Sequence, residues 1–171
     1  MLLFFRFVLI VIASRFRRRI GPLGESVVHF TVLPTDCDLN FHLNGGRFIS
    51  FTDIARVELL GRMRILSKMI RIGWRPIMGG VLVRFRREIL PFERFTIRTR
   101  VAGWDERWFY IEHIIEKKGE FCAVAHARTM IRKKGGSVPA GELFALAGET
   151  VIASPELPRF VALWRDAENA R

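Results

Sequence analysis

One continuous stretch decides the fold: TDCDLNFHLNGG at residues 35–46, followed directly by RFISFTDIARVELLG at residues 47–61. In the second part, apolar residues recur at the spacing of one helix face, and Gly61 is a typical helix end. The members of this apolar stripe are Phe48, Phe51, Ile54, Ala55 and Leu59. We therefore expect a long, mostly buried helix over residues 47–61, preceded by a polar loop.

The segments around this helix have the patterns of β-strands. Residues 94–104 alternate apolar and polar side chains, which is the period of a strand with one buried face. Strands are expected at residues 27–33, 76–90, 94–104, 108–117 and 120–133, and shorter helices at 63–72, 140–147 and 157–167. The turns between the last three strands are too short for crossover helices, so we expect antiparallel neighbours and interpret the last four strands as a meander. This order indicates an α+β fold with one long helix across one antiparallel sheet.

Composition indicates one domain and no metal site. The chain has 171 residues, 50% of them hydrophobic, which is enough for one substantial core. Cys37 and Cys122 are too few for a disulfide framework and lack zinc-ligand spacing. Both are interpreted as free thiols of a cytoplasmic protein.

The charge is strongly basic, with 28 Lys+Arg against 17 Asp+Glu and a formal net charge of +11. Such a surplus attracts anions in general, including coenzyme A phosphates, acidic lipids and nucleic acid. The arginines are mostly dispersed along expected strands, without a basic tail or a nucleic-acid-binding module. We therefore do not expect nucleic acid as a partner, and we interpret many of these arginines as solvated strand faces.

The first twenty residues are treated as a separate segment, and residues 21–171 as the domain. Residues 1–13 are almost wholly apolar apart from Arg6, and arginines follow at Arg15, Arg17, Arg18 and Arg19. As a helix these thirteen residues cover about 20 Å, less than the roughly 30 Å of a bilayer core. Two alternatives stay open: residues 1–19 contact the inner face of a membrane through a basic flank, or they form a helix packed on the protein or a dimer partner.

The 35–46 segment carries the residue types that acyl transfer needs. A carboxylate can activate water or attack directly, an amide or imidazole can orient the reactants, and backbone N–H groups can bind a developing oxyanion. The spacing of Asp36, Asp38 and Asn40 is also that of a calcium loop, but the required glycine is replaced by Phe41 and the closing glutamate by Arg47. A second alternative is that Asp36, Asp38 and Asn44 only form turns and a helix cap.

The same segment resembles a known family. The run Asp38-x-Asn40-x-His42-x-Asn44, with the following helix, resembles the Asp-x-Asn-x-His-x-Asn-Asn segment of acyl-ACP and acyl-CoA thioesterases of the hot-dog superfamily. Asp36-Cys37-Asp38 is similar to the Asp-Cys-Asp of 4-hydroxybenzoyl-CoA thioesterase-like enzymes. The resemblance covers roughly residues 27–139 and implies a hot-dog fold, in which a five- to six-stranded antiparallel sheet wraps around the buried helix.

The resemblance also implies a function in lipid metabolism: hydrolysis of an acyl-CoA or acyl-ACP thioester to a free acid and a thiol, without a cofactor. It makes Asp38 the base or nucleophile, with Asn40 and His42 orienting water and substrate. The substrate-binding residues would be Asn44, Gly45, Gly46, Phe48 and Glu58, the first three through backbone N–H groups. Gly45 departs from the second Asn of the family pattern.

The resemblance further implies a homodimer, or a dimer of dimers, with active sites at the subunit interface. Glu58 has two interpretations, a second carboxylate facing the acyl pocket or a structural partner of a buried Arg or His. The alternative function is a non-catalytic acyl-CoA- or lipid-binding module at a membrane surface.

Overall fold

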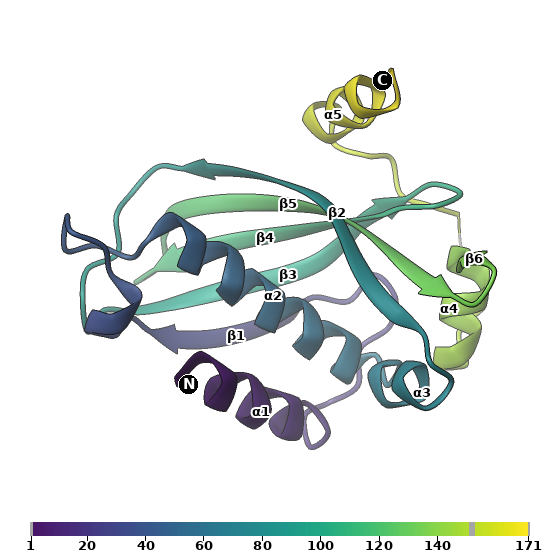
Figure 1. Ribbon diagram of the computed structural model, residues 1–171, viewed down its shortest axis with the longest axis horizontal. Helices are drawn as coiled ribbons and strands as arrows, with labels where there is room; N and C mark the ends of the chain where they lie inside the picture. The colour runs from purple at the N-terminus through teal and green to yellow at the C-terminus, as the bar shows by residue number, and fades with distance from the viewer. Residues whose placement is uncertain (1, 151–152, 171) are drawn as a thin grey trace.

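A curled antiparallel sheet wraps around the long helix α2 (Gly45–Arg62), as Figure 1 shows for the computed structural model, which describes residues 2–150 and 153–170. The strands are β1 (Ser26–Thr31), β2 (Arg75–Phe85), β3 (Arg94–Trp104), β4 (Phe109–Lys117), β5 (Glu120–Lys133) and the short β6 (Gly136–Ser137). The other helices are α1 (Leu2–Ser14), α3 (Leu66–Arg71), α4 (Ala140–Ala147) and α5 (Arg159–Asn169), and a short 3-10 helix spans Pro34–Asp36. The expected α+β class with one central helix is confirmed.

The strand order is β1-β3-β4-β5-β2, with β6 paired to β5. The antiparallel β3-β4-β5 meander is confirmed, but its extension to β2 is wrong, because β2 pairs with β5 at the far edge. The connection between β2 and β3, residues 86–93, spans up to about 26 Å when extended, whereas crossing three strand spacings needs only about 14 Å. It runs across the end of the sheet: the N–H of Arg86 donates to Cys122 near one edge, and that of Phe92 donates to Val32 near the other.

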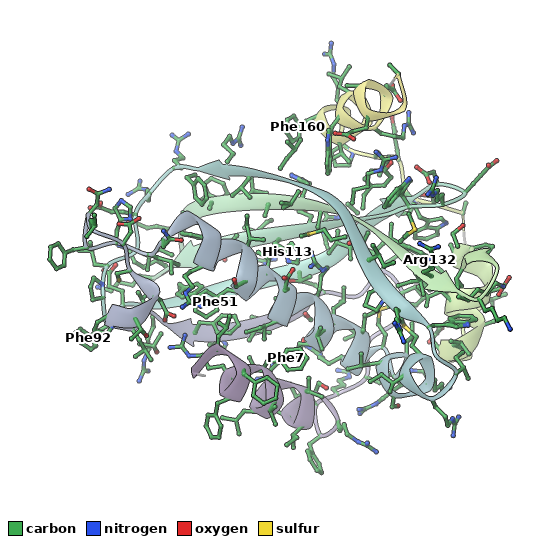
Figure 2. The ribbon with its side chains drawn as sticks, in the orientation of Figure 1. Phe7, Phe51, Phe92, His113, Arg132 and Phe160 are labelled. Atoms are coloured by element: carbon green, nitrogen blue, oxygen red, sulfur yellow. The ribbon has the colours of Figure 1, made fainter. Side chains whose placement is uncertain are left out.

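The core lies between α2 and the concave face of the sheet. Phe51, fully buried on α2, packs its ring 4.7 Å from the ring of Phe30 on β1 and 5.3 Å from that of Phe95 on β3 (Figure 2). A second group of buried apolar residues, including Leu59 and Phe109, fills the space towards Phe144 on α4. Burying α2 in this way explains why its apolar stripe is readable in the sequence.

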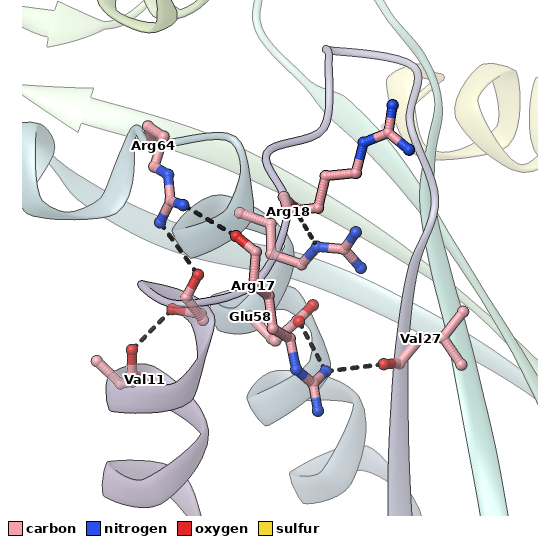
Figure 3. Close-up of polar contacts among 8 residues, drawn as sticks. Val11, Arg17, Arg18, Val27, Glu58 and Arg64 are labelled. Carbon is pink, nitrogen blue, oxygen red and sulfur yellow. Dashed lines mark hydrogen bonds and ion pairs between the residues drawn. The ribbon is translucent and has the colours of Figure 1, made fainter.

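Helix α1 packs along α2 with one face. Leu3, Phe7 and Ile10 lie against the first part of the core, and Ser14 is buried against Gly61 of α2. The chain after α1 is also held to the domain, because Arg64 donates to the carbonyl oxygens of Ser14 and Arg15 and, as Figure 3 shows, to that of Arg17. Of the two alternatives for this segment, packing on the protein therefore holds for the inner face of α1.

The contact between Ser14 and Gly61 gives a stability prediction. A Cβ added at Gly61 would lie 2.2 Å from Ser14 Oγ and 2.8 Å from Ser14 Cβ, so we expect Gly61→Ala to destabilise the protein by about 1–3 kcal/mol through overpacking. Adding Ser14→Gly should recover most of this loss. The measurement is the free energy of unfolding in urea for wild type, both single variants and the double variant. Stabilisation by Gly61→Ala of about 0.5–1 kcal/mol, as helix propensity alone predicts, would contradict the close contact.

His113 is a buried histidine in the layer beneath α2 (Figure 2). Its Nδ1 lies 2.9 Å from Thr99 Oγ1, and its Nε2 has no hydrogen-bond partner among the residues described. Burial, followed by the charges of Arg56 on α2 and His126 on β5, lowers the pKa of His113 well below its usual 6.5. The folded protein therefore holds this imidazole neutral at neutral pH.

The lowered pKa of His113 gives a pH dependence whose sign follows from linkage. Below pH 6.5, the ordinary pKa of His113, the unfolded chain takes up the proton first. Stability therefore falls with decreasing pH, by up to about 1.4 kcal/mol per pH unit, until the folded pKa is reached. His113→Gln should lack this contribution. Urea unfolding of both proteins at about pH 7.5 and about pH 5 measures it; an equal loss in both would exclude His113 as the cause.

Candidate functional site

The loop of residues 36–44, called here the 36–44 loop, is a small closed hairpin at the start of α2. The N–H of Asn44 donates to the carbonyl oxygen of Asp36 (3.0 Å), and the N–H of Asp38 donates to that of His42 (3.2 Å). Phe41, at the turn, has a positive φ of 57°, a conformation that is uncommon for residues other than glycine. The hairpin thus gives the spaced polar residues of this loop a defined shape, with its tip at Leu39 to Phe41.

Asp38 and His42 are brought together by this hairpin. Asp38 Oδ1 lies 3.5 Å from His42 Nδ1 and accepts the backbone N–H of Asn40 at 3.0 Å. The two side chains are about one third exposed or less, 27% for Asp38 and 32% for His42. Asn40 itself lies at the exposed tip of the loop. The loop therefore places the Asp38 carboxylate beside the His42 imidazole, but it does not bring the Asn40 side chain to them.

Asn44 caps α2. Its Oδ1 accepts the N–H groups of Gly46 (2.9 Å) and Arg47 (3.3 Å), as a helix cap does. The expectation that all backbone N–H groups of residues 44–46 are available to a substrate is therefore too broad, since those of Asn44 and Gly46 are already bonded. Within the described part of the chain, the N–H of Gly45 is the one of these three without a hydrogen bond.

A cavity of about 440 Å³ opens beside the loop and the start of α2. Its lining residues are His42, Leu43, Gly45, Phe48, Phe85, Arg86, Arg87 and Glu88. Phe48 is buried on α2 and packs edge-on against Phe85 of β2, with ring centroids 5.0 Å apart. The structure thus brings the predicted His42, Gly45 and Phe48 to one cavity whose other wall is basic.

Sequence reasoning missed Phe85, Arg86 and Arg87 as wall residues of this cavity. The sequence does contain arginines here, at Arg84, Arg86 and Arg87. In the sequence alone, they fit the solvated face of an expected strand. In the structure β2 ends at Phe85, and Arg86 and Arg87 follow it into the connection that crosses the sheet end. Only the position of β2 at the sheet edge next to β5 places these arginines opposite the start of α2.

Two carboxylates near the motif have structural partners. Asp36 Oδ2 lies 2.8 Å from Arg6 Nη1 of α1 and accepts the N–H of Leu33 at 3.0 Å. Glu58, fully buried, accepts from Arg17 Nη1 at 3.0 Å. It lies beneath the end of α1 rather than at the cavity, so the structure does not bring it to the other predicted substrate-binding residues.

Cys37 lies between the two aspartates of the motif. Burial, then the charges of Asp36 and Asp38, raises the pKa of its thiol above the usual value. At neutral pH it is a protonated thiol and a poor nucleophile, which leaves Asp38 as the chemically suited group in the loop. Within residues 2–150 and 153–170, no group of three or more His, Cys, Asp or Glu side chains has the arrangement of a metal site.

A second, largely apolar cavity of about 240 Å³ lies along the C-terminal half of α2. Leu59 and Met63 of α2 form one side, Ile111 and Ile131 of the sheet form another, and Phe144 of α4 closes it. Arg56, ion-paired with Asp53, and the buried hydroxyl of Thr129 are among its few polar groups. Among the described residues, apolar space beside α2 is therefore found at the far end of the helix as well as at its start.

Comparison with known proteins agrees with this architecture. The profile of the family described as "Thioesterase-like superfamily" matches residues 32–164. Protein THEM6 of Xenopus laevis is 32% identical over 164 residues, covering 94% of this chain and 77% of that protein. Thioesterase poxG of Penicillium oxalicum is 28% identical over 139 residues, covering 73% of this chain, and the match spans 46% of the fungal protein.

Among solved structures, 1,4-dihydroxy-2-naphthoyl-CoA thioesterase Slr0204 from Synechocystis has the same fold, with a TM-score of 0.61 and 15% identity over 72% of this chain and 95% of that one. The resemblance read from the 36–44 loop is thus confirmed at the level of family and fold. The chain belongs to the thioesterase-like superfamily, a class of thioester hydrolases with the hot-dog fold.

Proposed function

We propose that the protein hydrolyses acyl-CoA thioesters, with Asp38 as general base or nucleophile. The observation that carries this is the cavity beside the start of α2, where His42, the free N–H of Gly45 and two arginines converge. Asp38 is not itself a lining residue, but its carboxylate lies 3.5 Å from Nδ1 of His42, which lines the cavity. No other described loop combines a carboxylate, an imidazole and an open helix N-terminus.

The arrangement supports a simple reaction path. As a general base, Asp38 takes a proton from water while the oxygen of that water adds to the thioester carbon. The Gly45 N–H, at the positive end of the α2 dipole, donates to the oxyanion. The C–S bond then breaks, and the leaving thiolate takes up the proton. If Asp38 attacks directly instead, an anhydride forms and water hydrolyses it in a second step.

Coenzyme A is the carrier that the basic wall favours. Arg86 and Arg87 line the cavity on the side away from the loop, and guanidinium groups bind phosphates through charge-assisted hydrogen bonds. Arg87 also pairs with Glu120 at 3.0 Å, whereas the Arg86 side chain makes no ion pair among the residues described. An acyl-ACP thioester, whose phosphopantetheine carries one phosphate, is the alternative carrier, and the apolar lining of Phe48 and Phe85 suits a fatty or aromatic acyl group.

A homodimer with sites at the subunit interface forms part of the proposal. The tip of the 36–44 loop exposes Leu39 (96%) and Phe41 (76%), which leaves apolar side chains in water beside the cavity. Ile77 and Met78 of β2 are also exposed, and β2 is an edge strand of the sheet. Exposed apolar patches and unpaired edge strands are typical of surfaces that a partner covers.

A second candidate is an acyl-CoA-binding module without turnover. It is supported by the hydrogen bond that Asp38 accepts from the N–H of Asn40. This contact gives the aspartate a structural role in the turn, and that role needs no chemistry. Tight acyl-CoA binding without thiol release would favour this candidate.

Substitution at Asp38 separates the two candidates. Asn can accept the same N–H bond from Asn40 and keep the turn, but it cannot act as a base. We therefore expect Asp38→Asn and Asp38→Ala both to lower kcat for thiol release from acyl-CoA by about a hundredfold or more. If Asp38→Asn retains wild-type kcat while only Asp38→Ala loses it, the carboxylate shapes the loop and performs no chemistry.

Glu58→Gln is the matched carboxylate control. Glu58 is paired with Arg17, so this change should lower stability while leaving kcat of the folded enzyme within about twofold of wild type. Unfolding in urea and thiol release, measured on the same samples, separate the two effects. A loss of kcat comparable to that of Asp38→Asn would instead give Glu58 a role in the reaction.

Substitution of Arg86 tests whether coenzyme A is the acyl carrier. Arg86→Ala should raise KM for acyl-CoA by about tenfold, the loss of one charged hydrogen bond, and leave KM for the matching acyl-pantetheine unchanged, because that substrate lacks the nucleotide phosphates. Steady-state thiol release with both substrates measures it. Arg94→Ala, at the start of β3, serves as a control of equal charge. Equal effects of Arg86→Ala on both substrates would contradict phosphate recognition.

A further inference from the structure

Helix α1 carries apolar side chains on two opposite faces. The inner face packs on the domain through Leu3, Phe7 and Ile10. On the other side, residues spaced three or four apart share a face that points to solvent. This outer face of α1 consists of Phe4 (71% exposed), Phe5 (62%), Leu9 (50%) and Ile12 (52%), with Phe16 (85%) directly after the helix.

Packing within the domain does not account for the outer face of α1. The inner face alone buries the helix against α2, and Ser14 fixes its end against Gly61. Single exposed apolar residues are common on protein surfaces, but a contiguous group of large ones marks an interaction surface. The outer face of α1 thus has the character of an interaction surface that the protein's own core does not use.

The flank of α1 is basic and held in place. Arg15 and Arg18 are exposed, and neither side chain makes an ion pair with the residues that the structure describes. Their backbone is fixed, because Arg64 donates to the carbonyl oxygen of Arg15 and Arg62 donates to that of Arg18, the bond drawn at Arg18 in Figure 3. The guanidinium groups of Arg15 and Arg18, without an ion pair among the described residues, thus extend from a fixed backbone at the end of the apolar outer face.

We propose that the outer face of α1 docks the protein on the surface of an anionic phospholipid bilayer. With α1 in the plane of the interface, its apolar side chains enter the acyl boundary and Arg15 and Arg18 meet the headgroup phosphates, the pattern of interfacial helices. A second copy of the chain fits less well, since pairing two such faces brings together basic flanks of a protein with a net charge of +11.

The helix lies on the bilayer and does not cross it. α1 has 13 residues, about 20 Å of helix, and its inner face stays committed to α2. Among the described residues, no helix has the length and apolar character that a membrane span requires. This docking does not depend on thioester hydrolysis, so its test and that of the proposed function are separate.

The experiment is co-sedimentation of the full chain with vesicles of phosphatidylcholine, with or without phosphatidylglycerol. Wild type should bind the anionic vesicles more tightly, and added salt should weaken that binding. The triple variant Phe5→Ser, Leu9→Ser, Ile12→Ser should lower affinity by about a hundredfold. Arg15→Gln with Arg18→Gln should lower affinity for the anionic vesicles by about tenfold and leave binding to pure phosphatidylcholine unchanged.

A matched control replaces equally exposed apolar residues elsewhere: Ile70→Ser and Ile72→Ser at α3 and Leu163→Ser on α5. It should bind vesicles like wild type. Thermal unfolding verifies that each variant is folded. Wild-type protein that stays in the supernatant with both vesicle types overturns the proposal, as does a folded α1 triple variant that binds like wild type. A third outcome also overturns the proposal: the wild type does not bind vesicles but forms a concentration-dependent dimer, and among the variants only the α1 triple variant loses that dimer. This result would assign the outer face of α1 to a second copy of the chain.

Discussion

The burial of α2 against the concave face of the sheet is the interaction on which the rest of the structure depends. Phe51 contributes most visibly, since its ring touches Phe30 and Phe95 from two strands that are neighbours in the sheet. Apolar burial of this kind is the main favourable term in folding. It fixes the axis of α2 and thereby the position of its N-terminus, where the polar loop begins.

The candidate site follows from how the chain enters α2. Asn44 caps the helix and consumes two of its first N–H groups, and the hairpin before it sets Asp38 beside His42. Among residues 44–46 this leaves the N–H of Gly45, a residue that lines the cavity, without a hydrogen bond to the described residues. Capping and the proposed chemistry are compatible, because the cap uses the Asn44 side chain whereas the proposal gives its roles to Asp38 and Gly45.

Charged contacts link α1 to the site and to the core. Arg6 pairs with Asp36 at the base of the 36–44 loop, and Arg17 pairs with the fully buried Glu58 of α2. A buried carboxylate without a partner is costly, so removal of residues 2–17 would expose the core and also leave both carboxylates without these arginines. The first helix is thus part of the packed domain on one side and a free apolar surface on the other.

The sequence by itself determined the central helix, the class of the fold and the loop that carries the family resemblance. These features are local: helical spacing of Phe48, Phe51 and Leu59, strand alternation, and the short run from Asp38 to Asn44 are all read from neighbouring residues. The sequence also left two alternatives for Glu58, and the ion pair with Arg17 explains its place in an apolar stripe.

Only the tertiary structure decided the features that join distant segments. Strand β2 pairs with β5 because the connection over residues 86–93 crosses the sheet end, and strand patterns do not encode which strand is the neighbour. The same crossing brings Arg86 opposite Gly45, about forty residues away in the chain. Likewise, the apolar run of α1 is uniform in sequence, and only its packing on α2 separates a buried face from an exposed one.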